Sequence, residues 1–211
     1  MREYHKIENI FKRDNITKKL IINDFTNENF DFLKNNTWEF TEKVDGTNIR
    51  VYWDGYRVSF GGRTDKAQIP DDLLIELEKL FGGPENEQLF EQKFGNKEVI
   101  LFGEGYGGKI QKTGQLYSQN CKFILFDVLI NDIYLRRYDV DEVARYFNVD
   151  SVPIVLEGTL QDGVNYVKNI STSKISEKEL KMEGLVGRPK SELKDRTGRR
   201  IILKIKYEDF K

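Results

Sequence analysis

Cysteine and histidine are almost absent from this chain of 211 residues. Cys121 is the only cysteine and His5 the only histidine. One cysteine leaves no internal disulfide and no cysteine-based zinc site. One histidine excludes histidine triads and histidine metal cages. Sites that need several cysteines or several histidines are therefore excluded.

The chain also lacks an excess of charge of one sign and a long apolar run. Lys and Arg number 34 against 35 Asp and Glu, which gives a formal net charge of −1. A polyanion would therefore have to bind a local basic patch. No apolar run reaches the roughly 18 residues of a membrane span, and the charged N-terminus lacks the apolar core of a signal peptide. We expect an intracellular, cytoplasmic protein that binds no membrane.

Strand patterns outnumber helix patterns. The stretches "IRVYW" and "YRVSF" flank Asp54-Gly55, a pair that favours a two-residue hairpin turn. Further strands are expected at 98–104, 122–130, 152–158, 182–188 and 200–207. Helices are expected at 27–36, at 71–83, and at 139–149, where Asp139 and Glu142 form a capping-box pattern. These patterns predict an α+β fold of mainly antiparallel sheets with peripheral helices.

The last predicted strand carries the clearest chemical signal. Its alternation puts Leu203 and Ile205 on one face and Lys204 and Lys206 on the other. Two ammonium groups side by side repel each other unless an anion lies between them. The strand therefore presents either a solvated face or a phosphate site.

Lys43, in "EKVDGTN", is a candidate nucleophile. Such a lysine needs a lowered pKa, which neighbouring positive charge can supply. Lys204 and Lys206 could supply that charge and also neutralise a phosphate that Lys43 attacks. Glu104, among the glycines of "VILFGEGYGG", and Glu183, in "MEGLVGRP", could hold Mg²⁺ or bind ribose hydroxyls. The glycines themselves would allow a ligand to approach the backbone closely, unless they belong to an ordinary loop.

The order of these stretches resembles the covalent nucleotidyltransferase superfamily of ATP-dependent ligases and mRNA capping enzymes. "EKVDGTN" matches its lysine motif, Lys-x-Asp-Gly. "LFGEGYG", "FILFDV", "MEGLVGR" and "ILKIKY" are similar to its later motifs, in the same order over 42–207. Asn48 and "GGRTDK" at 61–66 resemble the RNA ligase 2 group of ATP-dependent RNA ligases.

The resemblance implies an adenylyltransferase domain of ATP-grasp-like ligase type that uses ATP with Mg²⁺ or Mn²⁺. Lys43 would form a lysyl-AMP intermediate while Lys204 and Lys206 contact the α-phosphate. AMP would pass to the 5′-phosphate of an RNA end, which is then sealed to a 3′-hydroxyl. The other nucleotide contacts would be Glu42, Asn48, Arg63, Glu104 at the ribose, Phe126 against adenine, and Glu183, which would also bind the metal.

RNA ends, nicked or single-stranded, are the expected substrates. The stretch 187–200 holds six basic and two acidic residues, and is either a phosphate-binding patch or a solvated loop. The residues expected to contact RNA are Arg188, Lys190, Arg199 and Arg200, with Lys109 and Lys112 after the glycine-rich stretch.

Because the chain ends four residues after Tyr207, we expect a single nucleotidyltransferase domain over 1–211. It would lack the C-terminal oligonucleotide-binding barrel or helical domain of longer relatives. We expect a monomer, and a separate subunit that supplies the missing domain stays open. The alternatives are a DNA ligase or capping-type guanylyltransferase on the same scaffold, and a non-catalytic module that binds RNA ends.

Overall fold

The computed structural model describes residues 1–169 and 172–211. They form two compact units. Unit 1 consists of Met1–His5, Asp45–Val152 and Ser176–Lys178, and unit 2 of Lys6–Val44, Pro153–Ile175 and Glu179–Lys211. Every helix within the described residues is too short or too polar to cross a membrane.

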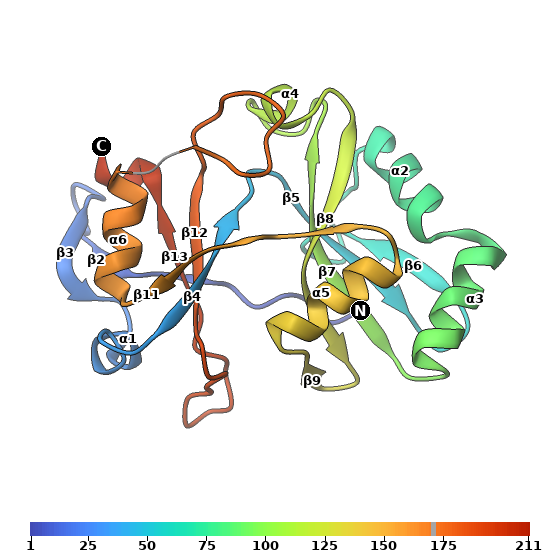
Figure 1. The fold of residues 1–211 in the computed structure, drawn as a ribbon, viewed down its shortest axis with the longest axis horizontal. Coiled ribbons are helices and arrows are strands. Elements are labelled where there is room, and N and C mark those ends of the chain that lie inside the picture. Colours follow the sequence, from blue (N-terminus) through green and yellow to red (C-terminus); the bar gives the residue numbers. More distant parts are fainter. Residues whose placement is uncertain (170–171) are drawn as a thin grey trace. The chain divides into compact units, whose positions relative to one another are not determined.

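A six-stranded sheet forms the centre of unit 1 (Figure 1). Its strand order is β10 (Asp150–Ser151), β8 (Cys121–Ile130), β7 (Val99–Gly107), β5 (Thr47–Trp53) and β6 (Val58–Gly61), with β9 (Ile133–Tyr134) paired to β8. Only β10 runs parallel to its neighbour. The helices are α2 (Asp71–Phe81), α3 (Gly83–Phe94), α4 (Gly114–Tyr117) and α5 (Arg137–Tyr146).

Helices α2, α3 and α5 share one core with the sheet of unit 1. Ile49, Val51 and Trp53 are buried in this core, as the alternation of β5 predicts. A Cβ atom on Gly103 would lie 2.2 Å from the Phe123 ring, and one on Gly105 would lie 2.3 Å from Leu73 Cδ2 of α2. These two glycines therefore admit core side chains, and the prediction that they make room for a ligand is wrong for both.

The turn between β5 and β6 has two central residues, as predicted, but they lie one residue later than the predicted Asp54-Gly55. Trp53 pairs with Val58, and the backbone N–H of Asp54 donates to Arg57 O at 3.2 Å. The centre of the turn is Gly55, at φ +98°, and Tyr56. Asp54 precedes that centre, and its carboxylate accepts the backbone N–H of Tyr56 at 2.8 Å. The side chain of Asp54 thus stabilises the turn from its first position.

The predicted capping box of α5 is not formed. The helix begins at Arg137, two residues before Asp139. Arg137 forms an ion pair with Asp141 in the next turn. Asp139 lies in the first turn, where its negative charge still suits the helix dipole.

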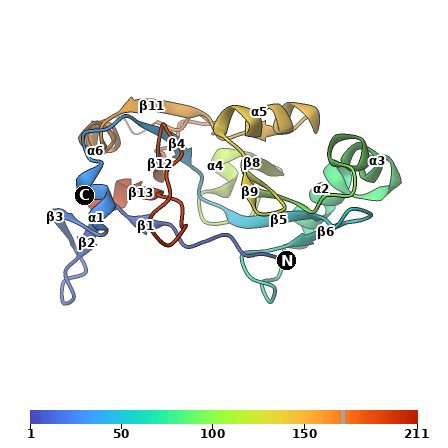
Figure 2. The ribbon, with the colours of Figure 1, turned by 90° about the horizontal axis from the view of Figure 1, so that it is seen from below.

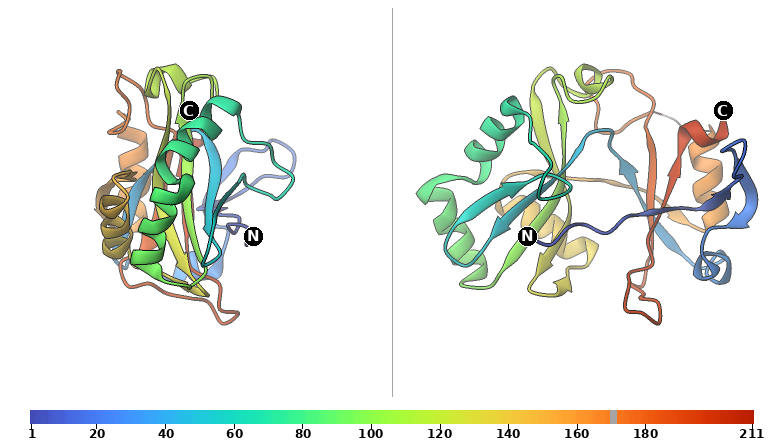
Figure 3. Two further views of the ribbon diagram at one scale, coloured as in Figure 1. Left: turned by 90° about the vertical axis from the view of Figure 1, so that its right-hand side faces the viewer. Right: turned by 180° about the vertical axis from the view of Figure 1, so that it is seen from behind.

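Unit 2 contains a five-stranded sheet and a separate hairpin. The sheet order is β1 (Glu8–Asn9), β13 (Leu203–Lys206), β12 (Gly184–Pro189), β4 (Trp38–Lys43) and β11 (Ile154–Gly158). Strand β1 runs parallel to β13, whereas the other neighbours are antiparallel. Figure 3 shows the blue N-terminal segment passing beside the red C-terminal strand. The hairpin is β2 (Phe11–Arg13) and β3 (Leu20–Phe25), dark blue in Figure 2.

One face of the unit 2 sheet is covered by helix α6 (Leu160–Asn169). Phe40, Leu203 and Ile205 are buried there with Val164 of the helix. The predicted alternation of the last strand is therefore confirmed, and Lys204 and Lys206 point to the opposite face. A short helix α1 (Glu28–Phe32), whose N-cap is Asn27, and a 3₁₀ helix η1 (Tyr207–Phe210) complete the unit. The α+β fold class is confirmed.

Candidate active site

Strand register brings the three predicted catalytic lysines onto one face of unit 2. In β12, Gly184 pairs with Lys43 on one side and with Lys206 on the other. One row further along, Val186 pairs with Lys204 of β13. The lysines therefore come from two strands separated by β12, and the small Gly184 stands between Lys43 and Lys206.

Glu183 lies between two of these ammonium groups. Its Oε2 is 2.6 Å from Lys43 Nζ and its Oε1 is 2.8 Å from Lys206 Nζ. The three side chains are between 16% and 33% exposed, so solvent reaches them only in part. Lys204 has no ion pair within the part of the chain that the structure describes. Lys43 and Lys206 thus share one carboxylate, and Lys204 adds a third positive charge to the cluster.

The pKa shifts follow from this charge excess. Burial lowers the pKa of Lys204, and the positive charges of Lys206 and Lys43 lower it further. Burial also acts to lower the pKa of Lys206, but the hydrogen bond and charge of Glu183 outweigh burial and raise that pKa. An added anion beside Lys204 would relieve its unfavourable charge, so the cluster suits a phosphate group.

Glu42 lies on the other face of β4 from Lys43. Its carboxylate is 1% exposed and accepts hydrogen bonds from Ser173 Oγ and, at 2.7 Å, from the backbone N–H of Lys174. Burial raises the pKa of Glu42 despite these bonds. The structure thus gives Glu42 a role in holding the 173–174 segment, and its contact with a nucleotide stays a prediction.

The predicted nucleoside contacts lie on one face of the sheet in unit 1. Asn48 of β5 pairs with Glu104 of β7. Phe126 follows on β8, is half-buried, and contacts Tyr4 edge to face at 5.1 Å. Phe123 points to the opposite face and packs on Phe81 at 5.3 Å. The geometry thus leaves Phe126, rather than Phe123, on the same side as Glu104.

Asn48 carries a polar atom that needs a partner. Its Oδ1 is buried and accepts no hydrogen bond within residues 1–169 and 172–211. A buried acceptor without a donor costs about 1–3 kcal/mol. A ligand amine or hydroxyl beside Glu104 would satisfy this oxygen, so the pair fits part of a nucleoside.

The Asp-Gly pair of the lysine motif is anchored in unit 1. Asp45 accepts a hydrogen bond from Thr113 Oγ1 at 2.9 Å, and Gly46 O accepts one from Gln111 Nε2 at 2.9 Å. A Cβ atom on Gly46 would lie 2.3 Å from Gly105 O. The chain therefore enters unit 1 through a close backbone contact that only glycine allows.

Arg50 anchors the loop that carries Arg63, a role that the motifs do not reveal. Its side chain is fully buried and donates to Gly62 O at 2.7 Å, Met1 O at 2.8 Å and Asp65 Oδ1 at 2.8 Å. These bonds hold the 61–67 loop, on which Arg63 is exposed. The available signal was an arginine at the second position of the otherwise apolar and aromatic run "IRVYW".

The predicted RNA-binding residues of unit 2 lie on β12 and the loop that follows it. Lys190 forms an ion pair with Glu157 at 2.7 Å, and Arg200 forms one with Glu192 at 2.6 Å. Arg199 is exposed, and Arg188 is half-buried. In unit 1, Lys109 and Lys112 are exposed after β7. The basic patch of unit 2 is therefore partly neutralised by its own acids.

A divalent cation would not be held by protein groups alone. No group of three or more His, Cys, Asp or Glu side chains with metal-binding geometry occurs among the described residues. Both oxygens of Glu183 are already paired with lysines. Mg²⁺ typically keeps several waters and binds substrate phosphates with one or two carboxylates. The site thus fits a cation that arrives with a phosphate, and Glu183 as its ligand stays a prediction.

Comparison with solved structures supports this arrangement at the level of the fold. Two glutamate-to-alanine mutants of Naegleria gruberi RNA ligase are similar to the chain, one solved with ATP and Mn and the other with AMP and Mn. Both are 19% identical, with TM-scores of 0.65 and 0.66. The matches cover 98% and 100% of this chain but 56% and 57% of the other, so the chain spans about half the length of these ligases.

Sequence comparison identifies the family. No curated protein matches the chain. The sequence model of the RNA ligase family matches residues 36–206, which include Lys43, Glu104, Glu183 and both lysines of β13. The chain therefore belongs to the RNA ligase family.

Proposed function

We propose that the chain is an ATP-dependent RNA ligase that works through a covalent lysyl-AMP intermediate. The neutral amine of Lys43 attacks the α-phosphorus of ATP in line with the departing pyrophosphate. The N–P bond forms as the P–O bond to pyrophosphate breaks, and the amine loses a proton to solvent. AMP then passes to the 5′-phosphate of an RNA end, and a 3′-hydroxyl displaces AMP to seal the strand.

The cluster around Glu183 carries this proposal. Lys43 and Lys206 meet at one carboxylate, and Lys204 lies on the same face without an ion pair in the described part of the chain. Lysine charge that exceeds carboxylate charge is complementary to an α-phosphate and to the charge that develops during its transfer. The ion pair between Lys43 and Glu183 must open before attack, because only a neutral amine is nucleophilic.

Residues of unit 1 are proposed to contact the nucleoside. Glu104 would accept hydrogen bonds from ribose hydroxyls, and Phe126 would stack on adenine. The unpaired Oδ1 of Asn48 supports a ligand contact there. The remaining proposed nucleotide contacts are Arg63 and Glu42.

The metal assignment rests on the fit described above and on the Naegleria enzyme. That enzyme has been solved with ATP and Mn. Mg²⁺ or Mn²⁺, when bound, would neutralise phosphate charge during the transfer. Glu183 is the proposed protein ligand, which would require it to release Lys43 or Lys206.

Covalent labelling tests the proposal. Wild type, Lys43→Ala and Lys19→Ala would be incubated with α-labelled ATP and Mg²⁺ or Mn²⁺, then separated under denaturing conditions. We expect acid-labile label on wild type and on the control variant Lys19→Ala. Lys19 is an exposed lysine in the loop of the β2–β3 hairpin. Label on Lys43→Ala should fall to background because no amine remains to form the bond.

The alternatives give different results in the same assay. Label from GTP in place of ATP would indicate a guanylyltransferase. No label from ATP, GTP or NAD would contradict the proposal and favour a non-catalytic module. Sealing of nicked duplexes with an RNA strand, compared with all-DNA duplexes, would then separate an RNA ligase from a DNA ligase.

A further inference from the structure

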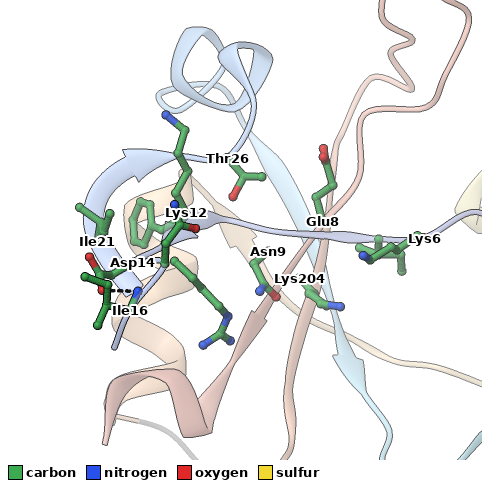
Figure 4. A pocket seen from close by; sticks show the side chains of 13 residues that line it. Lys6, Glu8, Asn9, Lys12, Asp14, Ile16, Ile21, Thr26 and Lys204 are labelled. Atoms are coloured by element: carbon green, nitrogen blue, oxygen red, sulfur yellow. Dashed lines mark hydrogen bonds between the residues drawn. The ribbon is translucent and has the colours of Figure 1, made fainter. Parts of the chain in front are cut away.

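A cavity of about 760 Å³ lies on the β1 side of unit 2 (Figure 4). Its walls come from the segment around β1, from the β2–β3 hairpin and from Lys204 of β13. Sites for small molecules typically measure about 300–1,000 Å³, so the cavity is large enough for a nucleotide. Lys204 belongs both to this cavity and to the lysine face described above.

Two ammonium groups in this cavity have no counter-ion. Neither Lys6 nor Lys204 forms an ion pair within the residues that the structure describes. Their mutual repulsion is one reason for the lowered pKa of Lys204, after burial and the nearer lysines. The other basic residues differ, because Lys12 pairs with Asp24 at 2.7 Å and Arg13 with Asp209. The Lys6–Lys204 end of the cavity therefore favours an anion.

The acids that line the cavity are already engaged. Glu8 Oε2 accepts a hydrogen bond from Asn27 Nδ2 at 3.2 Å. The carboxylate of Asp14 accepts the backbone N–H groups of Ile16 and Thr17, and these bonds lower its pKa. Neither carboxylate is paired with Lys6 or Lys204. Lys6 and Lys204 therefore keep positive charges that no ion pair neutralises, although the carboxylates of Glu8 and Asp14 also keep their charge in the wall.

The cavity wall also contains polar and apolar groups that could contact a ligand larger than a simple anion. Asn9 Oδ1 and Thr26 Oγ1 are buried and have no hydrogen-bond partner within the described part of the chain. Asn9 pairs with Lys204 across the parallel strands, and Figure 4 shows the two side chains pointing the same way. Ile16 and Ile21 line the wall and are 90% and 42% exposed. Phosphate, hydroxyl and apolar partners together suit a nucleotide.

The strand order places this cavity opposite Lys43. Across the sheet face the order is Lys43 on β4, then β12, then Lys204 and Lys206 on β13, then Asn9 on β1. In-line displacement puts the entering and leaving groups on opposite sides of the phosphorus. With the α-phosphate at the β13 lysines, the group opposite Lys43 would lie on the β1 side.

We propose that the cavity binds the 5′-phosphorylated terminal nucleotide of the RNA strand, with its phosphate between Lys6 and Lys204. Its ribose hydroxyls would reach Asn9 and Thr26. The proposal rests on the proposed function, in which an oxygen of the 5′-phosphate bonds to the α-phosphorus while the P–N bond to Lys43 breaks and the amine regains a proton. Pyrophosphate leaves from the same side in the first step and is the other source of phosphate.

Binding measurements separate these sources. The anisotropy of one labelled oligoribonucleotide, with either a 5′-phosphate or a 5′-hydroxyl, would be measured with wild type, Lys6→Gln, Asn9→Ala and the control Lys19→Gln. We expect wild type and Lys19→Gln to bind the phosphorylated end about tenfold more tightly. Lys6→Gln should lose most of that preference, and Lys6→Arg, which keeps the charge, should retain it. Asn9→Ala should weaken binding of the phosphorylated end by a few-fold.

An unchanged end preference in a folded Lys6→Gln variant would overturn the assignment. If inorganic pyrophosphate also ceases to compete with the labelled RNA in that variant, the cavity would be assigned to pyrophosphate alone. Adenylylation by ATP, measured on the same samples, keeps the two proposals apart. If ATP labels the protein but its preference for the phosphorylated end does not depend on Lys6, only the cavity assignment is refuted. If that preference depends on Lys6 but ATP does not label the protein, only the ligase function is refuted.

Discussion

At the residue scale, the lysine face of unit 2 is built with more positive than negative charge. Glu183 pairs with Lys43 and Lys206 and leaves Lys204 without an ion pair in the described residues. This excess of positive charge lowers the stability of the fold, and a bound phosphate would offset that loss. Catalytic groups commonly carry perturbed pKa values for this reason.

Lys204→Met should raise stability while it removes adenylylation. The folded-state pKa of Lys204 is lowered from 10.5. Between that lowered value and 10.5 the unfolded chain binds more protons than the folded one, so wild-type stability rises with pH in this window. Removal of the charge should therefore raise the unfolding midpoint at neutral pH and flatten the alkaline rise. Thermal unfolding from pH 7 to pH 10.5 measures both effects.

Lys19→Met is the matched control for this series, since Lys19 is exposed and far along the chain from the cluster. Its midpoint should follow that of wild type at each pH. A Lys204→Met midpoint at or below that of wild type at neutral pH would contradict the charge account.

The catalytic lysines could be predicted from their motifs, whereas the residues of the β1 cavity could not. Lys204 and Lys206 follow from a period-two alternation that any strand of that composition would show. Asn9 belongs to a two-residue strand that pairs in parallel with the far end of the chain, and Lys6 precedes that strand. Such a pairing has no local signature, because both the strand length and the partner are set by tertiary packing.

At the scale of elements, the loop 61–67 depends on a side chain of the neighbouring strand. Arg50 is fully buried and bonds two backbone carbonyls and Asp65. Asp65 is 67% exposed, so the guanidinium is only partly neutralised. Loss of Arg50 would leave the loop that carries Arg63 without its anchor.

Arg50→Met should lower the free energy of unfolding by about 3 kcal/mol, because it leaves the buried Gly62 carbonyl unsatisfied and removes the bonds to Met1 O and Asp65. Limited proteolysis should then cut first at Arg63 or Lys66. Arg57→Met, on the exposed β5–β6 loop, serves as the control and should change stability by less than about 0.5 kcal/mol. Equal stability and equal proteolysis of the two variants would refute the anchoring role.

The predictions of single elements are wrong where the local sequence is compatible with two conformations. Asp54-Gly55 can form the centre of a two-residue turn, or Asp54 can precede the centre and bond the turn with its side chain. The structure adopts the second solution. Asp139 could cap α5, but the helix begins two residues earlier, at Arg137, whose guanidinium forms an ion pair with Asp141. The position of the turn and the start of α5 depend on tertiary contacts, so the local sequence does not predict them.

At the scale of the whole molecule, a net charge of −1 makes RNA affinity depend on which basic groups are unpaired. Lys190 and Arg200 are already paired with Glu157 and Glu192. Arg199 is exposed and unpaired in the described residues. Counter-ions are released on binding only from phosphates that a protein cation newly neutralises.

Arg199→Ala should therefore reduce the salt dependence of RNA binding more than Lys190→Ala does. For single-stranded RNA, one lost phosphate contact changes the slope of log K against log salt by about 0.7. Anisotropy titrations over a range of salt concentrations measure the slopes. A larger change for Lys190→Ala would mean that its pair with Glu157 opens in the complex, and would contradict the ranking.

The division of the chain into two units could not be predicted from the sequence. The chain passes between the units at Val44–Asp45 and Val152–Pro153, among other points. Neither Val44–Asp45 nor Val152–Pro153 lies in a stretch with the Gly/Ser-rich composition of a linker. Each unit is assembled from separated segments, which a reading along the chain does not detect.

The most direct test of the central claim is to locate the AMP. Wild type would be incubated with ATP and Mg²⁺, denatured, digested with protease, and its peptides sequenced by mass spectrometry. We predict one AMP adduct, on the side chain of Lys43. An adduct on another lysine, Lys204 or Lys206 included, would contradict the assignment of Lys43 as the nucleophile.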